Sequence, residues 1–108
     1  MTESRQGIPL TADAFEARLE EEFVFGRPEG GEARLKLISL RRLPRHELTD
    51  REPFSMIFVM KDQEPLGPGL HRLLHPDLES FDMFISRVTV PRLQKADPAG
   101  MFYEAIFN

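Results

Sequence analysis

Two histidines have the spacing that most readily suggests chemistry in this chain. His71 and His75 stand at i and i+4, where two imidazoles on one helix face can chelate a metal ion. The residues around them alternate between apolar and polar types, which favours a strand. On a strand that rises about 3.3 Å per residue, the two rings stand roughly 13 Å apart, too far to share one ion. We therefore expect no metal site, and we expect His75 to organise a turn with Pro76 and Asp77.

The other candidates for catalysis do not combine into a site. The chain has no cysteine, which excludes thiol nucleophiles, disulfides and thiolate zinc sites together. Four serines lack the flanking glycines of a nucleophile elbow: Ser39, Ser55, Ser80 and Ser86. The carboxylates fall at an expected helix end or in loops, and no pair of them can be argued to flank a substrate. We predict no catalytic residue, no cofactor and a non-enzymatic protein.

One run of positive charge is a candidate binding surface. It lies on the expected second strand and the loop after it, and it comprises Arg34, Lys36, Arg41, Arg42 and Arg45. Such a patch can bind an acidic partner or the phosphates of a nucleic acid. The chain as a whole carries a formal charge of −4, which repels phosphate, and its aromatic residues are expected in the core rather than stacked on bases. We expect a solvated strand face neutralised by nearby carboxylates, with nucleic-acid binding as the less favoured alternative.

The 108 residues suit one globular domain. A chain of 12.5 kDa buries roughly two-thirds of its surface on folding, which is enough for one core. No window approaches the roughly 20 apolar residues of a membrane helix, and Met1–Leu10 lacks the basic start and apolar middle of a signal peptide. We expect a single soluble, cytoplasmic domain over residues 1–108, in which residues 1–8 form a flexible lead-in.

The elements that must position these residues begin with a helix. Thr11 is a suitable N-cap, and Asp13 favours the positive end of the helix dipole. Phe15 and Leu19 follow at helical spacing. The three glutamates Glu20–Glu22 disfavour continuation, because negative charge is unfavourable at a helix C-terminus. The pattern predicts one short amphipathic helix that ends at these glutamates.

Six further runs have the composition and alternation of strands. They are Phe23–Phe25, Ala33–Leu40, Phe54–Met60, Leu70–His75, Phe81–Ser86 and Phe102–Phe107. The alternation blurs at Ile38–Leu40, where a β-bulge would explain it. Many positions are apolar on both parities. We predict a mainly β fold, a small antiparallel barrel or curled sheet of about six strands with one N-terminal helix, and an open sandwich as the competitor.

Short motifs along the chain resemble a small bacterial domain-of-unknown-function family. They are Leu10-Thr11-Ala12-Asp13-Ala14-Phe15, Pro53-Phe54-Ser55, Pro68-Gly69, Leu74-His75-Pro76, Phe84, and Tyr103-Glu104-Ala105 followed by Phe107-Asn108. The resemblance implies a short β-rich domain with no assigned chemistry, encoded near phage-tail-like fibre or collar proteins. The chain departs from the family pattern at Leu70, where an aromatic residue usually follows the glycine, and at Leu78–Ser80, where a glycine often follows the turn.

The missing site chemistry, the terminal strand and the resemblance favour a structural or adaptor module, placed in a phage-tail-like or surface-fibre assembly. If the terminal strand Phe102–Phe107 lies at a sheet edge, it can pair with a second protein, and we then predict partner contacts at Phe102, Tyr103, Glu104 and Phe107. An apolar cavity lined by methionine and phenylalanine would instead indicate a small-ligand-binding barrel. A nucleic-acid-binding barrel is the third hypothesis. We expect a protein partner and no membrane contact. The sequence is also compatible with a homo-oligomer.

Overall fold

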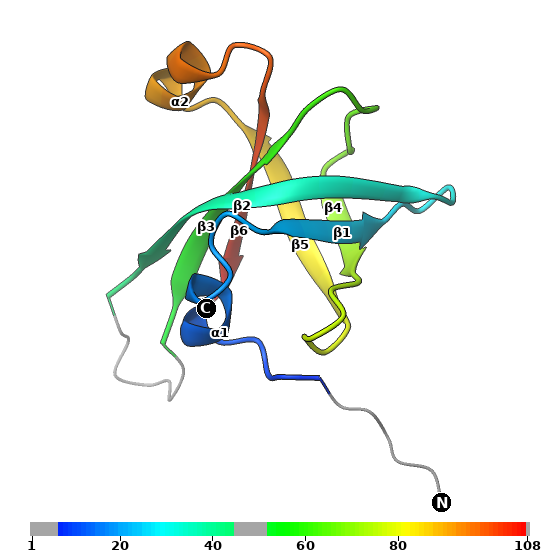
Figure 1. The fold of residues 1–108 in the computed structure, drawn as a ribbon, viewed down its shortest axis with the longest axis vertical. Coiled ribbons are helices and arrows are strands. Elements are labelled where there is room, and N and C mark those ends of the chain that lie inside the picture. The colour runs from blue at the N-terminus through cyan, green and yellow to red at the C-terminus, as the bar shows by residue number, and fades with distance from the viewer. Residues whose placement is uncertain (1–6, 45–51, 108) are drawn as a thin grey trace, which may run out of the picture.

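The computed structural model describes residues 7–44 and 52–107 and shows a closed barrel of six antiparallel strands (Figure 1). The elements are α1 (Ala12–Glu16), β1 (Glu22–Gly26), β2 (Glu32–Arg42), β3 (Phe54–Met60), β4 (Gly69–Leu73), β5 (Phe81–Val88), α2 (Pro91–Ala96) and β6 (Met101–Phe107). Around the barrel the strand order is β1-β2-β3-β6-β5-β4, and β4 pairs with β1. The predicted mainly β fold with a helix near the N-terminus is confirmed, as a barrel rather than a sandwich.

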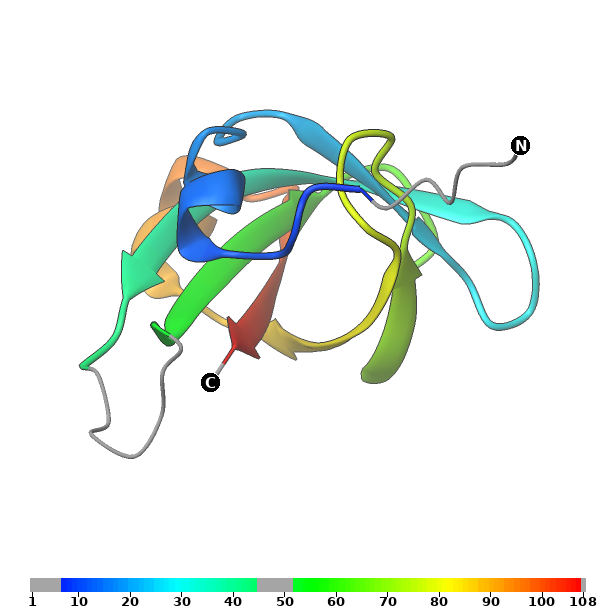
Figure 2. The same ribbon diagram turned by 90° about the horizontal axis from the view of Figure 1, so that it is seen from below.

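Helix α1 seals one end of the barrel (Figures 1 and 2). The Thr11 hydroxyl caps the helix by accepting a hydrogen bond from the backbone N–H of Ala14 at 3.1 Å. The fully buried Phe15 ring lies 5.8 Å from the rings of Phe23 and Phe54, measured between centroids. These contacts bury an apolar helix face against the ends of two strands.

The helix is shorter than predicted, because it ends at Glu16 instead of at the three glutamates. Leu19 is not part of the buried core, and its exposed fraction is 37%. The backbone N–H of Glu20 donates to the carbonyl of Leu37 at 2.7 Å, and the N–H of Leu37 donates to the carbonyl of Glu21 at 3.0 Å. These bonds hold Glu20 and Glu21 beside Leu37 of β2, so the helix does not continue to the three glutamates.

Strand β2 contains the predicted bulge. Its pairing with β3 changes register between Leu37 and Ser39, which leaves Ile38 as the extra residue. Before the bulge, odd-numbered residues such as Leu35 face the core, whereas the partly buried Leu40 packs against the core after it. The inward parity has changed from odd to even, as a one-residue bulge requires.

Helix α2 lies at the opposite end of the barrel from α1 and was not predicted (Figure 1). It has only six residues, begins with Pro91 and has no buried side chain, so it leaves no periodic signal in the sequence. Its Leu93 lines a groove of about 420 Å³ together with Val59 of β3 and Phe102 of β6. Those two residues are buried although they face away from the barrel core.

The barrel is not equally well paired around its circumference. Strand β3 pairs with β6 along its whole length, whereas β1 and β4 share two residue pairs, Phe25↔Leu73 and Gly26↔Arg72. Strand β5 changes partner along its length, because residues 81–85 pair with β4 and residues 86–88 pair with β6. Residues 105–107 of β6 thus have no ladder partner on β5. We call this split, between residues 81–85 and 105–107, the β5–β6 seam.

The described end of the lead-in is fixed to the turn that follows β4. The backbone N–H of Ile8 donates to the carbonyl of Asp77 at 3.0 Å, and the N–H of Glu79 donates to the carbonyl of Ile8 at 3.2 Å. A Cβ at Gly7 would overlap the backbone of Leu78, so this close approach requires glycine. Residues 1–6 of the expected flexible lead-in lie outside the described residues. Neither α1 nor α2 has the length and apolar character of a membrane span.

Candidate binding surface

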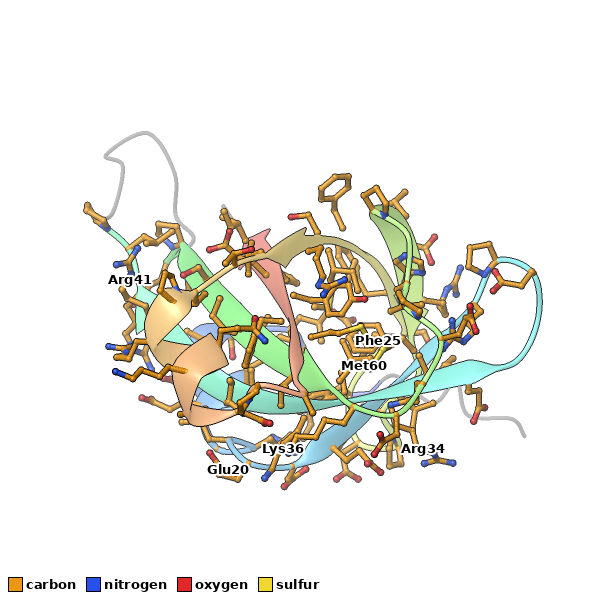
Figure 3. The ribbon with its side chains drawn as sticks, turned by 90° about the horizontal axis from the view of Figure 1, so that it is seen from above. Glu20, Phe25, Arg34, Lys36, Arg41 and Met60 are labelled. Atoms are coloured by element: carbon orange, nitrogen blue, oxygen red, sulfur yellow. The ribbon has the colours of Figure 1, made fainter. Side chains whose placement is uncertain are left out.

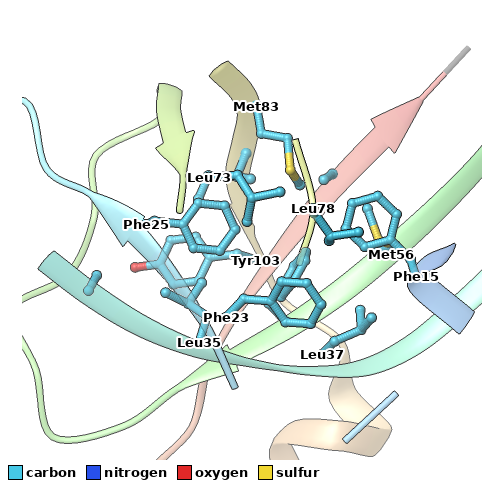
Figure 4. Packing of buried hydrophobic residues seen from close by; sticks show 14 of the residues in the cluster. Phe15, Phe23, Phe25, Leu35, Leu37, Met56, Leu73, Leu78, Met83 and Tyr103 are labelled. Atoms are coloured by element: carbon cyan, nitrogen blue, oxygen red, sulfur yellow. The ribbon is translucent and has the colours of Figure 1, made fainter. Parts of the chain in front are cut away.

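The interior of the barrel is filled by side chains (Figure 4). The largest fully buried residues are Phe15, Phe23, Phe25, Leu35, Leu37, Met56, Phe58, Met60, Leu73, Met83 and Tyr103, together with Phe102 beneath α2. Figure 3 shows Phe25 and Met60 close together within the ring of strands. The methionine and phenylalanine residues that suggested an internal ligand cavity therefore pack against one another.

The terminal strand β6 is not an edge strand at residues 102–104. These residues pair with β3 on one side and with β5 on the other. Tyr103 is fully buried, and its hydroxyl accepts a hydrogen bond from the backbone N–H of Leu66 at 3.0 Å. Phe102 is buried beneath α2, Glu104 is partly buried, and Phe107 packs against the core. The condition for strand pairing with a partner is therefore not met at residues 102–104, because closure of the barrel gives this part of β6 two neighbours.

An exposed apolar surface lies on the outside of β4, β5 and β6. Leu70 and Phe84 are directly opposite each other in the β4–β5 ladder, and their exposed fractions are 61% and 60%. Ile106, exposed by 52%, is on the outer side of β6, because its neighbours Tyr103 and Ala105 face inward. We call Leu70, Phe84 and Ile106 the outer apolar face. Leu70 and Phe84 are direct neighbours, and Ile106 lies across the β5–β6 seam from Phe84. Large exposed apolar patches mark interaction sites in soluble proteins more often than single apolar residues do.

Sequence reasoning missed the outer apolar face. The run alternates, with Phe81, Met83 and Ile85 on one side and Asp82, Phe84 and Ser86 on the other, but most aromatic residues of the chain were expected in the core. In the structure Met83 and Ile85 face the core, so Phe84 must point away from it.

The predicted basic patch is divided and largely paired with carboxylates. Arg34 lies 3.7 Å from Glu22, and Lys36 lies 3.4 Å from Glu20, measured between charged atoms. Figure 3 shows Glu20, Lys36 and Arg34 along one side of the barrel and Arg41 well away from them. Because the bulge changes the inward parity, Arg42 lies on the opposite side of β2 from Arg34 and Lys36, although the three share one parity in the sequence. Arg45 lies outside the described residues.

Arg42 instead holds a cluster of carboxylates at the α1 end of the barrel. Its Nη2 donates to Asp13 Oδ1 and Glu16 Oε1, both at 2.7 Å, and its Nη1 donates to Glu52. The hydrogen bond to Glu16, and to a smaller extent the hydrogen bond to Asp13, raise the pKa of Arg42 above its usual value, so the guanidinium keeps its charge. We call Arg42, Asp13, Glu16 and Glu52 the Arg42 cluster. Three carboxylates against one guanidinium give the cluster a formal charge of −2.

An open pocket of about 540 Å³ lies beside this cluster. Its apolar lining includes Leu10, Phe54, Phe81 and Phe107, and its rim carries the carboxylates of Asp13, Glu52 and Glu79. The Phe107 ring stacks on Phe54 with centroids 4.9 Å apart and lies 5.6 Å from Phe81 on the other side. We call this the end pocket. It lies at the mouth of the β5–β6 seam, since Phe81 and Phe107 belong to the two strands that separate there.

The two histidines have separate structural roles. His75 Nδ1 accepts a hydrogen bond from the backbone N–H of Asp77 at 3.1 Å, and its Nε2 lies 3.2 Å from Glu21. This confirms that His75 organises the turn, although through its own ring. His71 Nε2 lies 2.7 Å from the carbonyl of Gly67, and its Nδ1 is buried without a hydrogen-bond partner. Within the described residues, no three His, Asp or Glu side chains gather as metal ligands.

Together the fold and these surfaces define a small closed antiparallel β-barrel with a filled core, an exposed apolar face and an acidic end pocket. The chain belongs to the family described as "Domain of unknown function (DUF6916)", whose model matches residues 10–107. The resemblance to a small domain-of-unknown-function family is thereby confirmed. Comparison with curated proteins and with solved structures gave no match.

Proposed function

We propose that the protein is a non-enzymatic adaptor module that binds a protein partner through the outer apolar face. The observation that carries this proposal is the exposure of Leu70, Phe84 and Ile106 on the outside of neighbouring strands. Burial of a leucine, isoleucine or phenylalanine side chain stabilises a complex by roughly 1.5–3 kcal/mol. An aromatic residue with aliphatic neighbours is also a typical centre of a protein interface.

The surroundings of this face suit a protein interface. The Arg72 guanidinium bonds Asp82 at 2.6 Å beside Leu70 and Phe84, and Glu104 lies on the outer side of β6 next to Ile106. Charged groups around an apolar centre form the polar rim seen in specific interfaces. We place this module in the cytoplasm of a bacterium, in a phage-tail-like or surface-fibre assembly. The support for that setting is the resemblance carried by the short sequence motifs.

The test compares the proteins that are captured from a lysate of the host by three tagged forms of the chain. They are the unmodified protein, the double variant Leu70→Ser with Phe84→Ser, and the control variant Leu19→Ser. Leu19 is also an exposed leucine, but it follows α1 and lies outside the outer apolar face. We expect an assembly protein to be enriched by the unmodified and control forms and lost from the double variant. Direct titration of that purified protein should then show a Kd at least about tenfold weaker for the double variant.

Equal capture by the double variant would contradict the role of the outer apolar face. Enrichment of nothing above a tag-only control would contradict the adaptor function itself. Circular dichroism of each variant shows whether the barrel has folded, so that misfolding is not mistaken for lost binding. Both substitutions are at exposed positions, where changes in unfolding free energy are usually small.

One observation favours a second candidate, the small-ligand-binding barrel. Because the core is filled, a ligand would occupy the end pocket, whose volume lies within the range of small-molecule sites. The nucleic-acid hypothesis has less support, since Arg34 and Lys36 each have a carboxylate partner.

A further inference from the structure

We infer that the end pocket binds a short, extended and basic peptide segment of a partner protein, in which an apolar residue stands between lysines or arginines. This inference does not rest on the outer apolar face, which is on the outside of β4, β5 and β6. It follows from three independent features of the pocket: its aromatic wall, its charge and the unpaired strand segments beside it.

The aromatic wall provides the apolar contact. Phe81 is exposed by 44%, although it has the inward parity of the buried Met83 and Ile85. It remains accessible because β5 and β6 separate at this end, and its ring reaches Phe107 across the separation. An apolar side chain, or the methylene stem of a lysine, can cover these rings while its charged head stays in water.

The charge of the pocket selects a cation. The Arg42 cluster has a formal charge of −2, and Glu79 on the rim adds another negative charge, giving −3 in total. Arg42 already donates to three carboxylates, so it cannot neutralise Glu79 as well. A lysine or arginine of the peptide would meet this surplus and could also lie against the faces of the Phe81 and Phe107 rings.

The unpaired strand segments favour a peptide over a small amine. Among the residues that the structure describes, residues 105–107 form ladder pairs only with β3, and residues 81–85 form ladder pairs only with β4. One side of each segment therefore has main-chain groups that are not used in the sheet. An extended peptide can form backbone hydrogen bonds to such a strand, while its alternate side chains enter the neighbouring pocket.

The experiment titrates the full chain with three matched capped tripeptides, Lys-Leu-Lys, Gln-Leu-Gln and Glu-Leu-Glu, and follows backbone amide NMR signals. We expect the lysine peptide to shift the amides of Phe81, Phe107 and Asp13. We expect the glutamine peptide to bind at least about tenfold more weakly, and the glutamate peptide to cause no shift. Added salt should weaken binding of the lysine peptide and leave the glutamine peptide unchanged.

Three variants test the proposed contacts. Glu79→Gln should reduce the preference for the lysine peptide over the glutamine peptide, because it removes one negative charge and leaves the Arg42 cluster in place, and Phe81→Ser should weaken binding of both peptides. Glu29→Gln, which removes a carboxylate from the turn between β1 and β2, is the control and should change neither affinity. Equal binding of the lysine and glutamine peptides would overturn the inference, as would shifts confined to another surface or no shift with any peptide. None of these outcomes depends on Leu70 or Phe84, so the two proposals can fail separately.

Discussion

The hydroxyl oxygen of Tyr103 accepts a hydrogen bond from the backbone N–H of Leu66 at 3.0 Å, and both residues are buried. The bond joins β6 to the loop between β3 and β4. We predict that Tyr103→Phe lowers the free energy of unfolding by about 1–3 kcal/mol, because it leaves a buried N–H without an acceptor while the ring is retained. Urea unfolding measures the change. A loss within error of zero would mean that water or another acceptor replaces the hydroxyl.

The His75 ring is predicted to stabilise the turn after β4 through its Nδ1 atom. The ring packs 4.8 Å from Phe23, and its Nδ1 accepts the Asp77 N–H. His75→Ala should lower the free energy of unfolding by about 2–4 kcal/mol. His75→Asn should lose less than His75→Gln, because the Asn oxygen can take the place of Nδ1. The reverse order, measured by urea unfolding, would assign the larger contribution to the contact with Glu21.

Two glycines are predicted to respond differently to the same added methyl group. A Cβ at Gly100 would lie 2.8 Å from Val59 Cγ2 and 3.1 Å from Phe102 Cζ, whereas a Cβ at Gly67 would meet no atom within 4 Å. Gly100→Ala should therefore lower the free energy of unfolding by about 1–3 kcal/mol. Gly67→Ala should change it by less than about 0.5 kcal/mol. Similar values for the two variants in thermal or urea unfolding would show that α2 moves away at little cost.

The Arg42 cluster is predicted to stabilise the α1 end of the barrel electrostatically. Arg42→Met removes the guanidinium and leaves three carboxylates to repel one another. The unfolding temperature should fall by more than in Arg41→Met, which changes the neighbouring exposed arginine. The difference between the two variants should shrink as salt is raised, because ions screen charge repulsion. Equal unfolding temperatures at low salt would show that the cluster contributes nothing measurable.

The alternation of apolar and polar residues was sufficient to predict the strands. It located all six of them and the bulge near Ile38, because a half-buried strand requires a period of two. It could not reveal α2, which buries no side chain, or the early end of α1. That end depends on the backbone hydrogen bonds that join Glu20 and Glu21 to Leu37, a residue far from them in the sequence. Contacts of this kind leave no local pattern.

The candidate sites were harder to predict, because they depend on which parity faces inward. The alternation places Phe84 opposite Met83 and Ile85, but only the barrel shows that Met83 and Ile85 face the core and Phe84 faces solvent. Arg42 reads as part of a basic patch until the bulge and α1 bring it to Asp13 and Glu16. The neutralisation of Arg34 and Lys36 was expected from the abundance of carboxylates, but their partners were not.

The closure of the barrel through only two residue pairs between β1 and β4 has a kinetic consequence. These strands meet only after the chain has reversed direction three times between them, so their contact carries a larger loop-closure entropy than the hairpin of β1 and β2. We expect the ring to close late in folding and to reopen first at this junction in the native state. The amide hydrogens of Phe25 and Leu73 should then exchange with solvent through an opening of lower free energy than the amide hydrogens in the middle of β3 require. Strand β3 has a long ladder on each side.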